Sequence, residues 1–196
     1  WNPGRAVQHL VEEGRVSIVN QDAVLLTGDS DAVHEVHTED SVIEADHVVM
    51  CAGAIATPLL LLSSGMGAIN SQIGVGLQDH PTIAFTMARL DSDRGVFDAS
   101  VHLKGVTNSG GRFIVLAYER VSREVSSDAL ITVSLMSPTS RGTISMLDGE
   151  VSVSMNMLST QADIDGMRES VRELVRICNS PSVQRTTRSI SVDDRG

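Results

Sequence analysis

Aromatic residues, cysteines and clustered basic residues are all scarce in this sequence. Aromatic side chains make up only 3% of the 196 residues, so a core must be built from Val, Ile, Leu, Met and Ala, within a hydrophobic share of 41%. The formal net charge is -10, and Lys and Arg form no cluster. Because binding to a phosphate backbone depends on clustered cations, we expect no nucleic-acid partner.

Long apolar runs and disulfide patterns are missing as well. The apolar run 58–62 stops at Ser63, far short of the roughly 20 residues that span a bilayer, so we predict no membrane span. Cys51 and Cys178 lie far apart and form no Cys-x-x-Cys pair, which favours a reducing, cytoplasmic location. No signal peptide is visible in the sequence, and because it starts at Trp1 rather than Met we interpret it as a piece of a longer protein.

The first third of the sequence predicts a helix followed by a small β-meander. Apolar residues at helical spacing predict a helix over 5–13, which Gly14 ends. Short apolar runs separated by turn residues predict strands over 16–19, 23–27, 32–37 and 41–44.

Residues 47–65 predict a strand, a turn of small residues and a helix. The apolar run 48–51 does not alternate, which is typical of a strand buried on both faces of a parallel sheet. Thr57 as N-cap and Pro58 as first helical residue predict a helix over 58–64, ended by Gly65. This arrangement is half of a nucleotide-binding unit.

The remainder predicts an antiparallel sheet with one long helix. Strands are expected over 82–89, 111–118, 129–135, 142–146 and 151–157, the last with clean alternation. Apolar positions predict an amphipathic helix over 163–178, capped by Ser159 or Thr160, which we expect to dock on the sheet. We expect a loop over 91–110 and a polar tail over 185–196.

The small residues Ala52, Gly53 and Ala54 leave bare backbone between the predicted strand and helix. A phosphate or ribose can approach such a backbone closely, near helix N–H groups that favour an anion. A plain tight turn explains the same residues equally well, since small residues are common in such turns.

Three stretches resemble the glucose–methanol–choline (GMC) oxidoreductases. Residues 53–67 are similar to the family's second signature, and 75–81 to its Gly-x-Asn-Leu-Gln-Asp-His-Pro element. Residues 137–144 resemble, more weakly, a Pro-x-Ser-x-Gly segment of the family's substrate domain. The matches in the signature are Gly53, Ala54, Thr57, Pro58, Leu60, Leu61, Ser64, Gly65, Met66 and Gly67.

The resemblance implies a mixed α+β and α/β fold. It consists of a partial FAD-binding, Rossmann-like domain with a β-meander over 1–81, and an antiparallel-sheet substrate domain covered by helices over 82–184. Residues 185–196 form the polar tail.

The resemblance also implies FAD as cofactor. The backbone of Ala23, or of Val24 if the register slips by one, would recognise the adenine, and Cys51, Ala52 and Gly53 would lie along the adenosine diphosphate. The implied reaction oxidises a small-molecule alcohol to an aldehyde or ketone. A His base takes the hydroxyl proton while a hydride passes to the flavin. The electron acceptor stays unidentified.

Several features depart from the family pattern. The N-terminal Gly-x-Gly-x-x-Gly fingerprint and the C-terminal catalytic His are absent, so we expect the catalytic residues outside this sequence and no turnover by it alone. The link from Gly67 to Val75 is short, and Gly76 stands where the family has Asn.

The histidines are weak catalytic candidates. His80 lies in a polar turn with Gln78 and Asp79, where a base or a structural bond to loop backbone is conceivable, and we favour the structural role. The other histidines considered show no zinc-site spacing, and we predict no metal site: His34, His37, His47 and His102.

Two alternatives to an FAD alcohol oxidoreductase remain. One is a non-catalytic binding or interaction module that keeps the sheet and helix. The other is a flavoprotein with the same FAD fold and a different substrate, such as an amine or a sterol.

Overall fold

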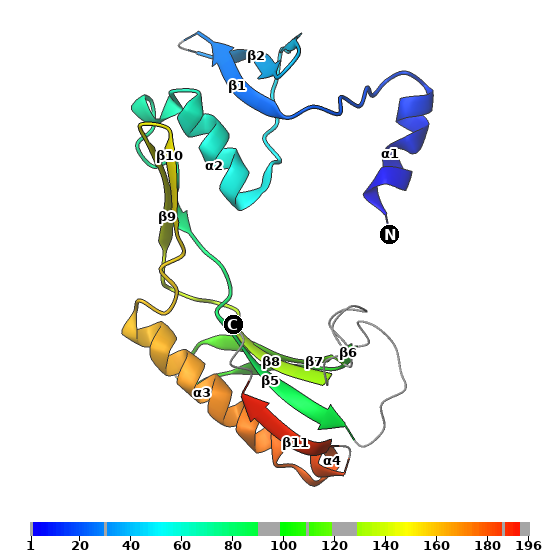
Figure 1. Ribbon diagram of the computed structural model, residues 1–196, viewed down its shortest axis with the longest axis vertical. Coiled ribbons are helices and arrows are strands. Elements are labelled where there is room, and N and C mark those ends of the chain that lie inside the picture. The colour runs from blue at the N-terminus through cyan, green and yellow to red at the C-terminus, as the bar shows by residue number, and fades with distance from the viewer. Residues whose placement is uncertain are drawn as a thin grey trace. The chain divides into compact units, whose positions relative to one another are not determined.

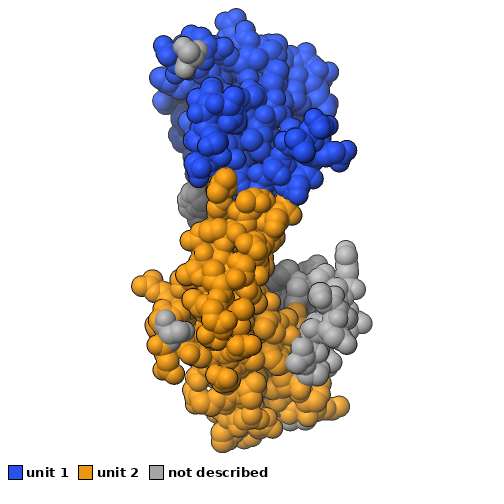
Figure 2. Space-filling view, turned by 90° about the vertical axis from the view of Figure 1, so that its left-hand side faces the viewer, with its two compact units in different colours: residues 1–74, 144–152 blue, residues 75–143, 153–196 orange. Residues whose placement is uncertain are grey.

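The computed structural model describes residues 2–29, 31–89, 99–108, 110–118, 129–185 and 187–192. The chain divides into two compact units, coloured separately in Figure 2. Unit 1 comprises residues 1–74 and 144–152, and unit 2 comprises residues 75–143 and 153–196.

Unit 1 opens with a helix and the predicted meander. Helix α1 (Pro3–Glu12) is capped by Asn2, whose side chain accepts from the backbone of Arg5. Strands β1 (Ala23–Gly28), β2 (Val33–Thr38) and β3 (Val42–Glu44) form an antiparallel sheet in sequence order, which confirms three predicted strands. The strand predicted over 16–19 is wrong, because these residues have no ladder partner among the described residues and Ile18 is 77% exposed.

The buried strand predicted from the apolar run 48–51 is also absent. Residues 47–51 are non-regular, and Val49 is 82% exposed. A strand of a parallel sheet needs a neighbour on each side to satisfy its backbone groups, and no described strand lies alongside this run.

Helix α2 (Gly53–Ser63) begins earlier than predicted. Pro58 lies inside it instead of at its first position. The preceding residues are compatible with a helix, and the first N–H groups of any helix lack intrahelical partners. Pro58 is the sixth residue of α2 and lies beyond these first groups, so its missing N–H removes one hydrogen bond of the helix. Gly65, with φ of 76°, follows the helix as predicted and leads into the 3₁₀ turn η1 (Met66–Ala68).

A three-stranded sheet in the order β10-β9-β4 contains the two downstream motifs. Its strands are β4 (Val75–Leu77), β9 (Gly142–Leu147) and β10 (Glu150–Ser154). The alternation over 151–157 predicted one covered face, which is wrong: every residue of β10 is exposed, since no described layer packs on it.

Unit 2 is built on a five-stranded antiparallel sheet in the order β11-β5-β8-β7-β6 (Figure 1). The strands are β5 (Thr82–Arg89), β6 (Ala99–Val106), β7 (Arg112–Tyr118), β8 (Ala129–Leu135) and β11 (Thr187–Val192). Strand β8 lies at the centre, where Val133 pairs with Ile83 on one side and Val115 on the other.

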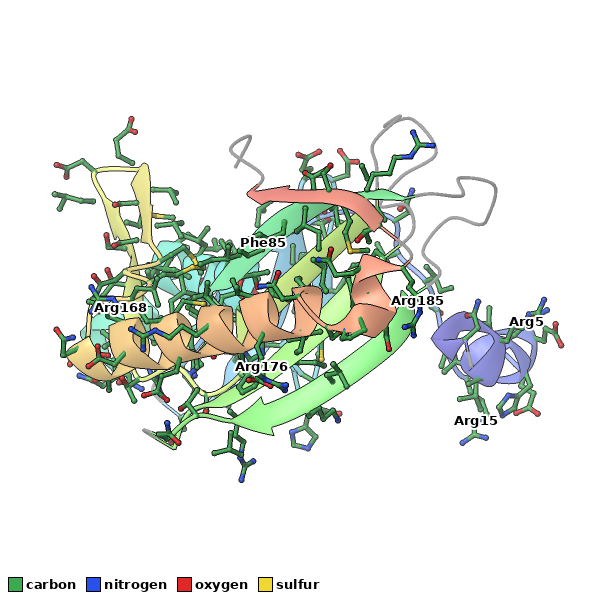
Figure 3. All side chains as sticks on the ribbon, turned by 90° about the horizontal axis from the view of Figure 1, so that it is seen from below. Arg5, Arg15, Phe85, Arg168, Arg176 and Arg185 are labelled. Carbon is green, nitrogen blue, oxygen red and sulfur yellow. The ribbon has the colours of Figure 1, made fainter. Side chains whose placement is uncertain are left out.

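Helix α3 (Gln161–Cys178) packs on one face of this sheet, as predicted. Thr160 is its N-cap and accepts from the backbone N–H of Asp163. Leu174 is fully buried against the sheet, and Phe85 of β5 packs against the same core (Figure 3). The outward face carries Arg168 and Arg176, which pair with acidic neighbours on the helix.

Two predictions for irregular segments are wrong where the structure describes them. Residues 99–106, inside the predicted loop 91–110, form β6 and pair with β7, while residues 90–98 and 109 lie outside the described residues. The predicted polar tail contains β11, which pairs with β5. A short helix, α4 (Pro181–Gln184), connects α3 to it.

Candidate functional site

The N-terminus of α2 presents bare backbone. Cys51, Ala52 and Gly53 are all exposed, and Ala52, the N-cap residue, has no side-chain group that can cap the helix. Gly53 has a φ of 88°, and no heavy atom of the described residues lies within 4 Å of the position a Cβ would occupy. The first turn of α2 carries no acidic residue. This end of the helix is therefore accessible to an anionic group and electrostatically suited to one.

A β-bulge interrupts β1 at the predicted adenine contact. Ala23 pairs with Thr38, but the next paired residue is Leu25, opposite His37, so Val24 has no partner in the register. A bulged residue keeps its backbone groups out of the ladder. The prediction named Val24 as the adenine contact if the register slips by one. Because its backbone has no partner strand residue, Val24 offers the adenine a more available backbone contact than Ala23 does.

A hydrogen-bonded link fixes the end of α2 to β1. The Ser64 hydroxyl donates to the Leu60 carbonyl at 2.6 Å and accepts from the backbone N–H of Leu26 at 2.9 Å. Leu26 is 3% exposed and is the buried point of the meander. The signature's serine therefore holds the helix against the meander.

A pocket of about 230 Å³ is lined by the meander, by the segment that precedes α2 and by α2 itself. Its lining combines Leu26 and Leu61 with Val48, Met50 and the polar pair Asp46–His47. Gly53 is not part of the lining, so this hollow and the bare N-terminus of α2 are separate features of unit 1.

The second and third motifs meet in the structure. Gln78 donates to the Pro138 carbonyl at 3.1 Å, and Val75 pairs with Thr143. Nδ1 of His80 lies 3.2 Å from the Leu135 carbonyl, a contact that fits the predicted structural role. The segment from β4 to β5 and the segment from β8 to β9 therefore lie side by side.

Asp163 of α3 binds the connection between β8 and β9. Its carboxylate accepts from the backbone N–H groups of Thr139 and Ser140, each at 2.7 Å, and from the Thr139 hydroxyl. Burial opposes ionisation, but the hydrogen bonds from Ser140 and Thr139 outweigh it and lower the pKa of Asp163 to about 2. In return, the Ser140 hydroxyl accepts from the backbone N–H groups of Ser159 and Thr160. The Thr-x-x-Asp spacing of a helix start was the sequence signal for this residue.

In unit 1, two carboxylates with a lowered pKa lie on the meander. Hydrogen bonds from the Asp31 backbone and from His34 lower the pKa of Asp29 to about 2. The Thr27 hydroxyl and His37 likewise hold the pKa of Glu35 below its ordinary value. These carboxylates organise a turn and a strand pair, and within the described residues no group of His, Cys, Asp or Glu is arranged to hold a metal ion.

Comparison with known proteins identifies the family that the segment around Gly53 resembles. Residues 17–82 match the family model of the GMC oxidoreductases, a stretch that includes the meander, α2 and the polar turn. The GMC oxidoreductases are therefore the family that this segment is similar to. The family resemblance predicted from the motifs is therefore confirmed.

Individual GMC relatives extend the similarity. An uncharacterized GMC-type oxidoreductase of Rhodococcus erythropolis is 30% identical over an alignment of 126 residues that covers 55% of this chain and 25% of that protein. The crystal structure of pyridoxine 4-oxidase from Mesorbium loti superposes with a TM-score of 0.61 at 17% identity, covering 90% of this chain and 41% of that one. The second match shows the fold, a mixed α/β arrangement with antiparallel sheets. This chain spans a quarter of the length of the curated relative.

The GMC segment fits the cofactor that its family binds. A dinucleotide needs close backbone approach and helix N–H groups near its phosphates, and Gly53 at the start of α2 offers both. Ala23, Cys51 and Ala52 are exposed and keep the accessibility that their predicted contacts require. None of the helices in the described ranges has the length and apolar character that crossing a membrane requires.

Proposed function

We propose that this chain is part of an FAD-dependent oxidoreductase that oxidises an alcohol to an aldehyde or ketone. Unit 1 holds the adenosine diphosphate half of FAD, and unit 2 supplies a wall of the substrate site. The observation that carries the proposal is the accessible, positive-φ backbone at Gly53, located within the GMC segment.

The residues of unit 1 bind and orient the cofactor. The N–H groups at the start of α2 bond the diphosphate, and the bare backbone of Ala52 and Gly53 allows close contact. The unpaired backbone of Val24, or that of Ala23 beside it, contacts the adenine. When bound, FAD accepts the hydride that the alcohol gives up.

Unit 2 presents a second sheet face for the substrate. In a strand, successive side chains point to opposite faces, and the residues that alternate with the α3-packed core form what we call the open face. Thr82 on this face is exposed, and Ile114, Leu116, Leu130 and Thr132 are half-buried. Because α3 occupies the other face, the substrate contacts come from the open face.

The test is a titration of the chain with FAD, monitored by amide NMR. We expect shifts at Cys51, Gly53, Ala54 and Val24, and loss of those shifts in Gly53→Val, since a branched side chain there blocks close approach. Gly14→Val is the matched control: Gly14 also has a positive φ, of 71°, in open space beyond α1, so the backbone strain is comparable.

The two variants separate a binding role from strain. If Gly14→Val weakened FAD binding as much as Gly53→Val, the effect would reflect general destabilisation. If FAD shifted no amide at the start of α2, the non-catalytic module would be the better account.

A further inference from the structure

The side chains of the open face indicate the polarity and charge of the alcohol, which the proposed function leaves undefined. Its three middle positions on β8 are Leu130, Thr132 and Ser134. Toward β7, Ser134 and Thr132 neighbour Ile114 and Leu116, so an aliphatic strip runs along that side. Toward β5, Ser134 and Thr132 neighbour Thr82 and Ala84, which makes that side small and hydroxylated.

Three hydroxyl groups of this face, those of Thr82, Thr132 and Ser134, already have partners. Thr82 Oγ1 lies 2.8 Å from Ser134 Oγ and donates to the His80 carbonyl at 3.0 Å. Thr132 Oγ1 points at the Leu116 carbonyl at 3.5 Å, a weak bond. A polyhydroxylated substrate loses its hydrogen bonds to water on binding and needs hydrogen bonds to the protein in their place. Protein hydroxyl groups that already have partners offer few such bonds.

The charges of this face disfavour a cation. Strands β5, β6, β7 and β8 contain no Asp or Glu at any position. The charged side chains that alternate onto the open face are basic, Lys104 of β6 and Arg112 of β7. Tyr118 is the single aromatic residue of these strands on this face, whereas a quaternary ammonium group is bound by several aromatic rings.

We infer that the open face takes a neutral, largely apolar alcohol in preference to a cationic or polyhydroxylated one. This inference rests on the proposed function, in which the open face contacts the substrate. The aliphatic strip of Ile114, Leu116 and Leu130 binds the body of the alcohol, and Lys104 and Arg112 repel a positive charge.

The experiment compares two probes of the same shape. Choline and 3,3-dimethylbutanol differ in that a quaternary nitrogen replaces a quaternary carbon, so charge is the main variable. Each is titrated into the 196-residue chain, and methyl NMR signals of Ile114, Leu116 and Leu130 are followed. We expect 3,3-dimethylbutanol to shift these signals at lower concentration than choline does.

A pair of variants on β6 tests the electrostatic part. Lys104→Glu places a carboxylate on the open face and should strengthen choline binding by about threefold, as expected for an exposed ion pair, with 3,3-dimethylbutanol unaffected. The control is Leu103→Glu, because Leu103 is the adjacent residue, 40% exposed, and points to the opposite face. We expect it to leave both affinities unchanged.

The outcomes separate this inference from the proposed function. Choline binding as tightly as 3,3-dimethylbutanol, or neither probe shifting open-face signals, would overturn the inference. FAD shifts at the start of α2 would leave the proposed function intact in either case. A chain that ignores FAD and still discriminates between the probes would overturn the proposed function and keep the preference as a property of the open face.

Discussion

At the residue scale, Asp163 combines burial with three hydrogen bonds to its carboxylate. It is 2% exposed, and its carboxylate bonds two backbone N–H groups of the connection before β9. Its pKa is lowered from 3.8 to about 2, so it stabilises the folded state above its ordinary pKa, and this contribution is lost as the pH falls from 3.8 toward 2. We predict that Asp163→Asn costs about 2 kcal/mol of the free energy of unfolding near neutral pH.

Urea unfolding followed by circular dichroism measures this loss. The control is Asp165→Asn on the same helix turn, whose carboxylate is exposed and bonds Arg168 and Gln161. We expect it to cost under about 1 kcal/mol. The difference between wild type and Asp163→Asn should shrink in acid; a difference that stays constant down to the lowest pH would contradict an ionised Asp163.

Glycines show what the sequence reveals about single residues. Gly76 departs from the family's Asn, yet its φ of 94° explains the substitution, because Asn and Gly are the residues that most readily adopt positive φ. The motif also marked Gly53 as special, although its exposure and the bulge beside Ala23 follow from pairings that no local pattern specifies.

At the element scale, α3 shows how closely a periodic pattern defines a buried face. Leu174 and Val175 are both among the apolar residues of the predicted amphipathic helix 163–178, but Leu174 is fully buried and Val175 is 45% exposed. Adjacent helical residues point about 100° apart, so a stripe one residue too wide includes an exposed position.

The difference in burial between Leu174 and Val175 allows a matched pair of mutations on α3. Leu174→Ala leaves a cavity between α3 and the sheet and should cost about 3 kcal/mol of the free energy of unfolding. Val175→Ala should cost less than about 1 kcal/mol. Chemical denaturation of both variants checks this, and equal losses would mean that α3 packs with a different face.

Sequence patterns succeeded for elements whose partners are local. The strands β1, β2 and β3 pair with their sequence neighbours, and β7 pairs with β8, so alternation and turns were sufficient to predict them. The run 48–51 has the composition of a buried strand but no described neighbour, and composition alone cannot supply a partner. Strand β6 was missed because it occurs in a stretch with little regular pattern.

At the scale of the whole molecule, the two units differ in the size of their hydrophobic cores. Unit 1 buries few hydrophobic side chains, Leu26 and Ile144 among them, whereas unit 2 has a continuous core that joins β7, β8 and α3. Helix α2 is apolar on all sides, yet none of its residues is buried. A helix of this composition is normally surrounded by protein.

Hydrogen exchange should reveal this asymmetry. Local opening is easiest where few apolar contacts hold a segment, so we predict that amides of β1, β2 and α2 exchange much faster than those of β7, β8 and α3. The comparison that decides is between Leu26 of β1 and Val133 of β8, both nearly fully buried and both within sheets. If burial of the residue alone set protection, the two amides would exchange alike. Slower exchange at Val133 by orders of magnitude would show that the size of the surrounding core governs stability in this chain.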